Sequence, residues 1–361
     1  MRLDKIILRC QPLRQLAGVL MVGIACAVWS STQASAQTSA QTSLQPPAQI
    51  HFRLQTREAV AAHLKSFSTR NSEREALIRK WFGDAGCTGA NLSEQGLDRR
   101  LPPNVICVLP GETAEVIVVG AHTDKVERFG DGVVDNWTGA VLLPSLLYSL
   151  SVKPRHHTLI FVGFSAEEKG LVVSRYYVDH LTSEQRAHME AMVNFDSLGL
   201  GPTQVWASHA DKVLLDALAA VAFAVGLPVT TMNVPNGASA DSESFARYRI
   251  PRITLHSVTQ PTWSILHSPF DKMAAIKMND YYDSYRLIAE YLAYLDDTLN
   301  PPLASRPAFT SITAKGRTVP NRNGNPNTAR TPACSTGGVK AGHRRVSGSA
   351  RSGSATTSSP R

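Results

Sequence analysis

The most informative part of this sequence reads EVIVVGAHTD at residues 115–124, GDGVVDNWTGA at 130–140 and TLIFVGFSAEEKG at 158–170. The first and third stretches contain runs of apolar, largely β-branched residues, which favour buried β-strands. Each run stops abruptly, and His122, Asp124, Glu167 and Glu168 follow within a few residues. In α/β sheets ligands bind beyond the carboxyl ends of the strands, where loops project side chains from a fixed framework. These four residues are therefore candidates for a functional site.

Apolar periodicity along the rest of the chain predicts strands that alternate with helices. We expect strands at 105–109, 115–120, 158–164, 191–196, 204–207 and 252–255. We expect two helices within 58–82 and further helices at 138–150, 171–181, 212–225 and 279–295. Ser72 and Glu75 form a capping-box pattern for the second helix, and Pro144 predicts a kink or a late start over 138–150. This alternation indicates one α/β domain.

Both ends of the chain differ in composition from the middle. A basic start, an apolar run over 16–29 and the small residues at 34–36 predict a secretory signal peptide over 1–36. A membrane anchor is the alternative, but the apolar run is shorter than the roughly 20 residues of a bilayer span. Residues 37–57 are interpreted as a linker, 58–299 as the folded domain, and the basic, Ser/Gly/Pro-rich segment 300–361 as a disordered tail. The expected location is secreted or periplasmic.

The formal net charge of +8 arises from the two ends of the chain. Residues 301–361 hold ten Lys and Arg and no acidic residue, and 1–36 contribute +3, which leaves −5 for 37–300. We therefore expect no nucleic acid partner for the folded domain, and no stable membrane span after signal removal. The sequence does not indicate an oligomeric state.

Cys87 and Cys107 are the two cysteines of the predicted domain. In an oxidising compartment a disulfide between them is plausible. Two buried free thiols are the alternative.

Five residues with metal-binding side chains recur along the predicted domain. They are His122, Asp135, Glu168, Asp196 and His267. Two imidazoles and three carboxylates suit a pair of zinc ions, with one carboxylate bridging and positions left open for water and substrate. Taken singly, each residue has a simpler explanation as a solvated or turn residue. Four of the five follow apolar runs, however, which favours a shared sheet edge.

The segments that carry these residues resemble a known family. The matching pieces are VVGAHTD, VVDNWTGA, FSAEEKGLVVSRYYV, VNFDSLG, ADSESFARYRIP and LHSPFDK, in this order between about 58 and 295. They resemble the co-catalytic dizinc aminopeptidases of metallopeptidase family M28. The resemblance implies a three-layer α/β sandwich in which helices flank a mixed central sheet, and a zinc peptidase domain over 58–299.

The resemblance also implies roles for the five residues. His122 and Asp196 would hold one zinc, Glu168 and His267 the other, and Asp135 would bridge both. Glu167, adjacent to a ligand, would be the general base, since a carboxylate beside a metal-activated water suits proton transfer.

Other residues are expected to support the site. Asp124 could orient His122 through the second ring nitrogen, and Asp271 could hold the His267 loop. Asn136 and Asp241 are assigned to the same supporting set. Leu266 departs from the family pattern, because some relatives have at this position a Tyr that helps to stabilise the oxyanion.

The predicted function is removal of N-terminal residues from peptides with a free amine. Two alternatives share the fold: a glutaminyl cyclase, which uses one zinc for intramolecular acyl transfer, and a carboxypeptidase relative. A non-catalytic binding domain is a further alternative, which the complete ligand set and Glu167 disfavour.

Overall fold

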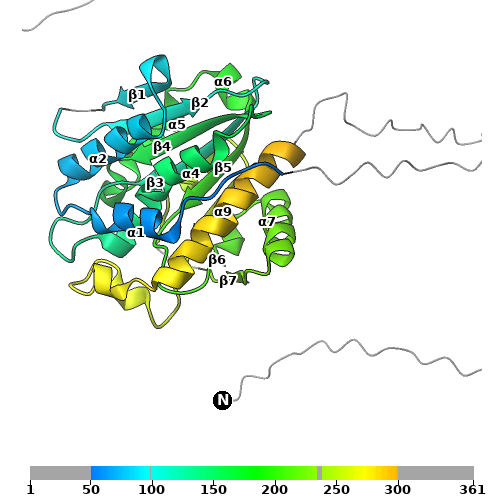
Figure 1. Ribbon diagram of the computed structural model, residues 1–361. Coiled ribbons are helices and arrows are strands. Elements are labelled where there is room, and N and C mark those ends of the chain that lie inside the picture. Colours follow the sequence, from blue (N-terminus) through cyan, green and yellow to red (C-terminus); the bar gives the residue numbers. More distant parts are fainter. Residues whose placement is uncertain (1–49, 98, 234–237, 300–361) are drawn as a thin grey trace, which may run out of the picture. The chain divides into compact units, whose positions relative to one another are not determined.

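The computed structural model describes residues 50–97, 99–233 and 238–299 (Figure 1). The predictions for the signal peptide, for linker residues 37–49 and for the tail lie outside this part. Its strands are β1 Leu92–Gln95, β2 Asn104–Leu109, β3 Val116–His122, β4 Thr158–Phe164, β5 Met189–Phe195, β6 Gln204–Val205, β7 Thr230–Thr231 and β8 Arg252–His256. Its α-helices are α1 Arg57–Lys65, α2 Asn71–Asp84, α3 Thr138–Ala140, α4 Leu142–Leu150, α5 Val172–Asp179, α6 Ser183–Ala187, α7 Lys212–Val225, α8 Glu243–Ala246 and α9 Met278–Thr298.

The described strands form one mixed sheet in the order β1-β2-β4-β3-β5-β8-β6-β7. Its centre is parallel, because β3 pairs in parallel with both β4 and β5, and β5 pairs in parallel with β8. The pairs β1–β2, β2–β4 and β6–β8 are antiparallel. Since the central strands run in the same direction, the segments that follow β3, β4 and β5 emerge at one edge of the sheet.

Alternation along β3 separates two apolar layers. Ile117 and Val119 pack with α1, α2, α4, α7 and α9, whereas Val118 packs with residues of α5 and α8 on the opposite face. Figure 1 shows α1, α2, α4 and α9 over one face of the sheet. Successive strand residues point to opposite faces, so the buried run on β3 requires cover on both sides. The predicted three-layer α/β sandwich is confirmed.

Two predictions about helix starts had different outcomes. Pro144 is the third residue of α4, where its missing N–H has no intrahelical partner to lose, so the late start is confirmed. The Ser72–Glu75 capping box is wrong, because α2 already begins at Asn71 and Arg70 is the N-cap. Ser68 lies outside the helix and accepts a hydrogen bond from Arg70 N at 3.1 Å.

Residues 50–56, which belong to the predicted linker, contact the folded domain. Arg53 N donates to Ser149 O of α4 at 3.0 Å, and Gln55 N donates to Tyr285 Oη of α9 at 2.9 Å. Thr56 then caps α1 by accepting from Ala59 N. Residues 50–56 thus lie along the helical layer.

Cys87 and Cys107 are joined in a disulfide between the end of α2 and β2, so the first of the two cysteine alternatives is the one observed. With 20 residues separating the two cysteines, closure of this loop stabilises the fold by about 3 kcal/mol in the chain-entropy model.

No helix in the described part of the chain is long and apolar enough to cross a membrane.

Candidate metal centre

The five predicted ligands lie at the carboxyl edge of the parallel strands. His122 is the last residue of β3, Asp196 follows β5, and Glu168 lies in the short 3-10 turn Glu167–Lys169 beyond β4. Asp135 comes from the turn Val133–Trp137, and His267 from the loop before α9. The structure brings all five into one connected cluster.

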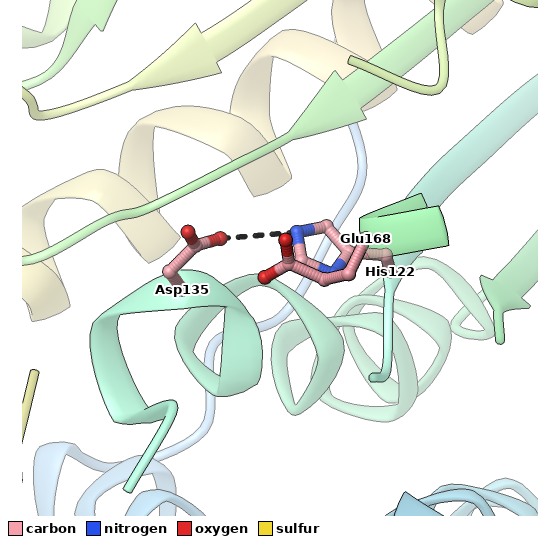
Figure 2. A group of neighbouring side chains, drawn as sticks. All are labelled: His122, Asp135 and Glu168. Atoms are coloured by element: carbon pink, nitrogen blue, oxygen red, sulfur yellow. Dashed lines mark hydrogen bonds and ion pairs between the residues drawn. The ribbon is translucent and has the colours of Figure 1, made fainter. Parts of the chain in front are cut away.

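The carboxylate of Asp135 lies between two imidazoles. Its Oδ1 is 3.1 Å from His122 Nε2, and its Oδ2 is 3.0 Å from His267 Nε2. Figure 2 shows Asp135 facing the His122 ring, with Glu168 alongside. Each oxygen therefore points to a different histidine, as expected of a bridging carboxylate.

The other two carboxylates divide between these histidines. Asp196 Oδ1 is 3.7 Å from His122 Nε2, whereas Glu168 Oε2 is 3.0 Å from His267 Nε2. Ligand atoms of His122, Asp135 and Glu168 lie within 4.8 Å of one another. The cluster thus separates into two donor pairs on either side of Asp135.

The donors fit zinc. Glu168 Oε1 is buried and has no hydrogen-bond partner among the described residues, although a buried carboxylate oxygen ordinarily has one. His122 Nδ1 lies 3.1 Å from the Asp124 carbonyl, so a proton on Nδ1 can be donated there while Nε2 stays available to a metal. Nitrogen and oxygen donors of this kind are typical zinc ligands.

Asp124 supports two ligand segments at once. Its Oδ1 is 3.4 Å from His122 Nδ1, and its carboxylate accepts from Glu167 N at 3.1 Å and from Glu168 N at 3.2 Å. The turn after β4 is thereby fixed relative to the end of β3. The arrangement agrees with the expected orienting role, and adds a contact to the glutamate turn.

Asp271 and Asn136 hold the backbone around Asp135. Asp271 accepts from Val134 N at 2.6 Å and from Asp135 N at 3.2 Å, which links the His267 loop to the bridging carboxylate. Asn136, joined to Asp135 by a cis peptide bond, donates to Phe195 O at 2.8 Å. The two loops and the end of β5 are therefore tied together.

Glu167 and Asp241 are carboxyl groups outside the donor cluster. Glu167 lines the cavity, and burial raises its pKa to about 10 in the metal-free protein. Asp241 is buried behind the cavity wall, and burial raises its pKa to about 7. Glu167 thus lies beside the ligands and reaches the space where a substrate would bind.

A cavity of about 510 Å³ opens over the cluster. Its lining includes Asp135, Glu167, Glu168, Asp196 and His267, together with apolar side chains of Trp206, Val258, Trp263 and Leu266. Its size and mixed lining are those of a small-molecule or peptide-end site.

His256 and Arg74 lie at the site but were not predicted as ligands, and His256 was expected to have a structural role. His256 lines the cavity, but its Nδ1 accepts from Val258 N and its Nε2 faces Met232 O, which leaves neither nitrogen for a metal. Arg74 lies buried beneath the ligands. No local signal marks Arg74, which resembles any helical arginine in the sequence.

Zinc binding is expected to release protons. Hydrogen bonds with Asp135 and Glu168 raise the pKa of His267 to about 11. Burial alone would lower the pKa of His122, but hydrogen bonds with Asp124, Asp135 and Asp196 raise it well above its usual value. Both imidazoles are therefore protonated near neutral pH without metal, and zinc must displace these protons.

About two protons should be released per molecule, and zinc affinity should rise with pH. Titration calorimetry in buffers of different ionisation enthalpy measures this number. Identical apparent enthalpies in all buffers would contradict the prediction.

Histidine and carboxylate donors at the carboxyl edge of a mixed α/β sheet, below an open cavity, are the arrangement of a metal-dependent hydrolase. The model of Peptidase family M28 matches residues 104–292, which is more than half of the chain. The chain belongs to peptidase family M28, a family of zinc metallopeptidases.

The similar proteins are aminopeptidases and related enzymes. Leupeptin-inactivating enzyme 1 of Streptomyces exfoliatus is 35% identical over 122 residues, which cover 33% of this chain and 24% of that protein. Aminopeptidase YwaD of Bacillus subtilis is 34% identical over 85 residues, covering 24% of this chain and 18% of that protein. The chain thus spans a quarter or less of the length of these curated relatives.

Solved structures support the fold. LapA aminopeptidase of Legionella pneumophila superposes with a TM-score of 0.56 at 21% identity, over 71% of this chain and 79% of that chain. A glutaminyl cyclase from an Acidobacteriales bacterium gives 0.57 at 18% identity, over 70% of this chain and 99% of that chain. At these identities the likeness concerns the fold alone.

Proposed function

We propose that this protein is a dizinc aminopeptidase that hydrolyses N-terminal residues from peptides. The main evidence is that the two oxygens of Asp135 face two different histidines, His122 at 3.1 Å and His267 at 3.0 Å. His122 and Asp196 would hold one zinc, Glu168 and His267 the other, and Asp135 both. The aminopeptidase names of the relatives support the proposed activity.

Bound zinc would supply Lewis acidity, which polarises the scissile carbonyl and acidifies the attacking water. With zinc bound, whose positive charge favours the ionised form of a nearby carboxylate, Glu167 would accept the proton of that water and then donate it to the leaving amine. Its carboxyl lines the cavity beside the ligands, and Asp124 fixes its backbone N–H. This division leaves Glu168 to bind metal while Glu167 transfers the proton.

The lining of the cavity supports action at an amino terminus. With zinc bound, the carboxylates of Glu167 and Asp196 would offer negative charge to an ammonium group. A carboxypeptidase would instead need a cation to bind a C-terminal carboxylate, but the Nζ of Lys125 donates to Val126 O at 2.6 Å. Trp206, Trp263 and Leu266 would receive an apolar first side chain. We therefore assign exopeptidase action on peptides that have a free amine and an apolar N-terminal residue.

A glutaminyl cyclase is the second candidate, because a solved enzyme of that activity shares the fold over 99% of its length. The two donor pairs flanking Asp135 favour the peptidase, since a single zinc needs no bridging carboxylate. The two reactions differ in products: hydrolysis frees an amino acid, whereas cyclisation of N-terminal glutamine releases ammonia.

The test combines metal content with a panel of aminoacyl reporter amides. We expect two zinc ions per chain and turnover that is highest for apolar residues. N-acetylated substrates are the matched control, and their equal turnover would overturn the assignment. Release of C-terminal residues would indicate the carboxypeptidase alternative, and ammonia from a glutaminyl peptide the cyclase.

The proposed place of action is outside the cytoplasm. The Cys87–Cys107 disulfide is typical of oxidising compartments, and the signal-like pattern over 1–36 predicts export. N-terminal sequencing of exported protein tests this, and retention of residues 1–30 would contradict it.

A further inference from the structure

Arg74 of α2 lies buried beneath the metal centre, with 0% of its surface exposed. Its Nε donates to Thr123 O at 2.5 Å, and both Nη1 and Nη2 donate to Gly132 O at 2.9 Å. Nη1 also lies 3.4 Å from Asp131 O. One guanidinium therefore holds backbone carbonyls from two separate segments.

These carbonyls lie beside ligands. Thr123 stands between His122 and Asp124, and Gly132 stands three residues before the bridging Asp135. Gly132 adopts a left-handed φ of +64°, and a Cβ there would lie 2.7 Å from Arg74 Nη1. The absence of a side chain thus allows the guanidinium to approach the main chain. Because the fork is planar and rigid, it fixes the distance between the two segments.

Within the described part of the chain, the hydrogen bonds of Arg74 go to backbone carbonyls rather than to carboxylates. Its guanidinium carbon lies 5.1 Å from the centre of the Trp137 ring. Burial lowers the pKa of Arg74 to about 10, while Asp124, Asp271 and Asp135 oppose that shift through their charge. The group therefore remains cationic at neutral pH.

We propose that Arg74 is a positioning residue of the metal centre. It holds the His122–Asp124 turn against the Asp131–Asp135 segment, so that the residues assigned as ligands are already in place before metal binds. This inference rests on the proposed function, because it concerns the same zinc site. It predicts that Arg74 contributes to zinc affinity beyond its contribution to stability.

Arg155 provides a matched control. It is also buried, at 1% exposure, and its Nε donates to a backbone carbonyl, Leu150 O, at 2.7 Å. It precedes β4, however, and so lies at the sheet edge opposite the ligands, where it faces Asp296. Substitution of Arg155 should therefore lower the stability of the protein without changing its zinc affinity.

The experiment measures the zinc dissociation constant by competition with a chromophoric chelator, together with the melting temperature of the metal-free protein. Arg74→Met is expected to raise the dissociation constant about 10–100-fold, and Arg74→Lys about tenfold, since a lysine can still donate to one segment but loses the fork that joins both. Arg155→Met should stay within about twofold of the wild type, because distant sites act independently.

Wild-type zinc affinity in both Arg74 variants would overturn the inference. So would an equal loss of affinity in Arg155→Met, since that result would reflect destabilisation alone. If Arg74→Met does not fold, Arg74→Lys compared with Arg155→Lys decides. A wild-type protein that binds no zinc would instead overturn the proposed function itself.

Discussion

Replacing Glu167 by glutamine should lower kcat by about 10²–10⁴-fold while both zinc ions remain bound. Glutamine keeps the size and the cavity position of the side chain but cannot accept the proton of the attacking water. Because the described contacts within the donor cluster join the five donors to one another and not to Glu167, metal binding should be unaffected. Steady-state kinetics and zinc content, measured on the same preparation, give both quantities.

Glu168→Gln is the matched control for this variant. It makes the same chemical change one residue away, but in the side chain whose Oε2 faces His267 at 3.0 Å. Glu168→Gln should therefore lose zinc together with activity. A near wild-type rate in Glu167→Gln, or loss of zinc equal to that of Glu168→Gln, would show that another group transfers the proton.

Replacing Asp135 by asparagine should remove activity and most of the bound zinc. An amide presents one oxygen and one NH₂ group, so it cannot place an anionic oxygen toward both His122 and His267. The substitution also removes the anion whose hydrogen bond helps to raise the pKa of His267 to about 11. Both donor pairs are thus affected by one substitution.

Metal analysis after dialysis measures the loss of zinc. Activity assays with and without added zinc then show whether the lost metal can be restored. Asp216→Asn serves as the control, because Asp216 is exposed and pairs with Lys212 on α7. The control should keep zinc and rate unchanged. If Asp135→Asn retained two zinc ions with wild-type affinity, Asp135 would not be the bridge.

Much of the architecture could be predicted from local pattern. The runs 116–119 and 158–164 became β3 and β4 because buried strands need apolar residues on both faces. Since parallel strands end at the same edge, the residues that follow them, such as His122 and Glu168, were found without any knowledge of packing. Short elements are too short for a periodic pattern: α6 has five residues behind its Thr182–Gln185 capping box, and β7 has only two.

What the sequence by itself determined was therefore the α/β class, the strands of the parallel centre and the identity of the candidate donors, since these depend on periodicity, on the ends of apolar runs and, for His267, on the LHSPFDK motif. Only the tertiary structure decided how the donors pair, with Asp135 between His122 and His267. It alone also revealed Arg74, whose contacts with Thr123 and Gly132 join residues 49 and 58 positions apart. Such contacts leave no periodic trace, because they arise from how α2 packs against the loops beyond β3. The preference of each segment for helix or strand depends on its own residues, whereas the distances between segments are set by tertiary packing.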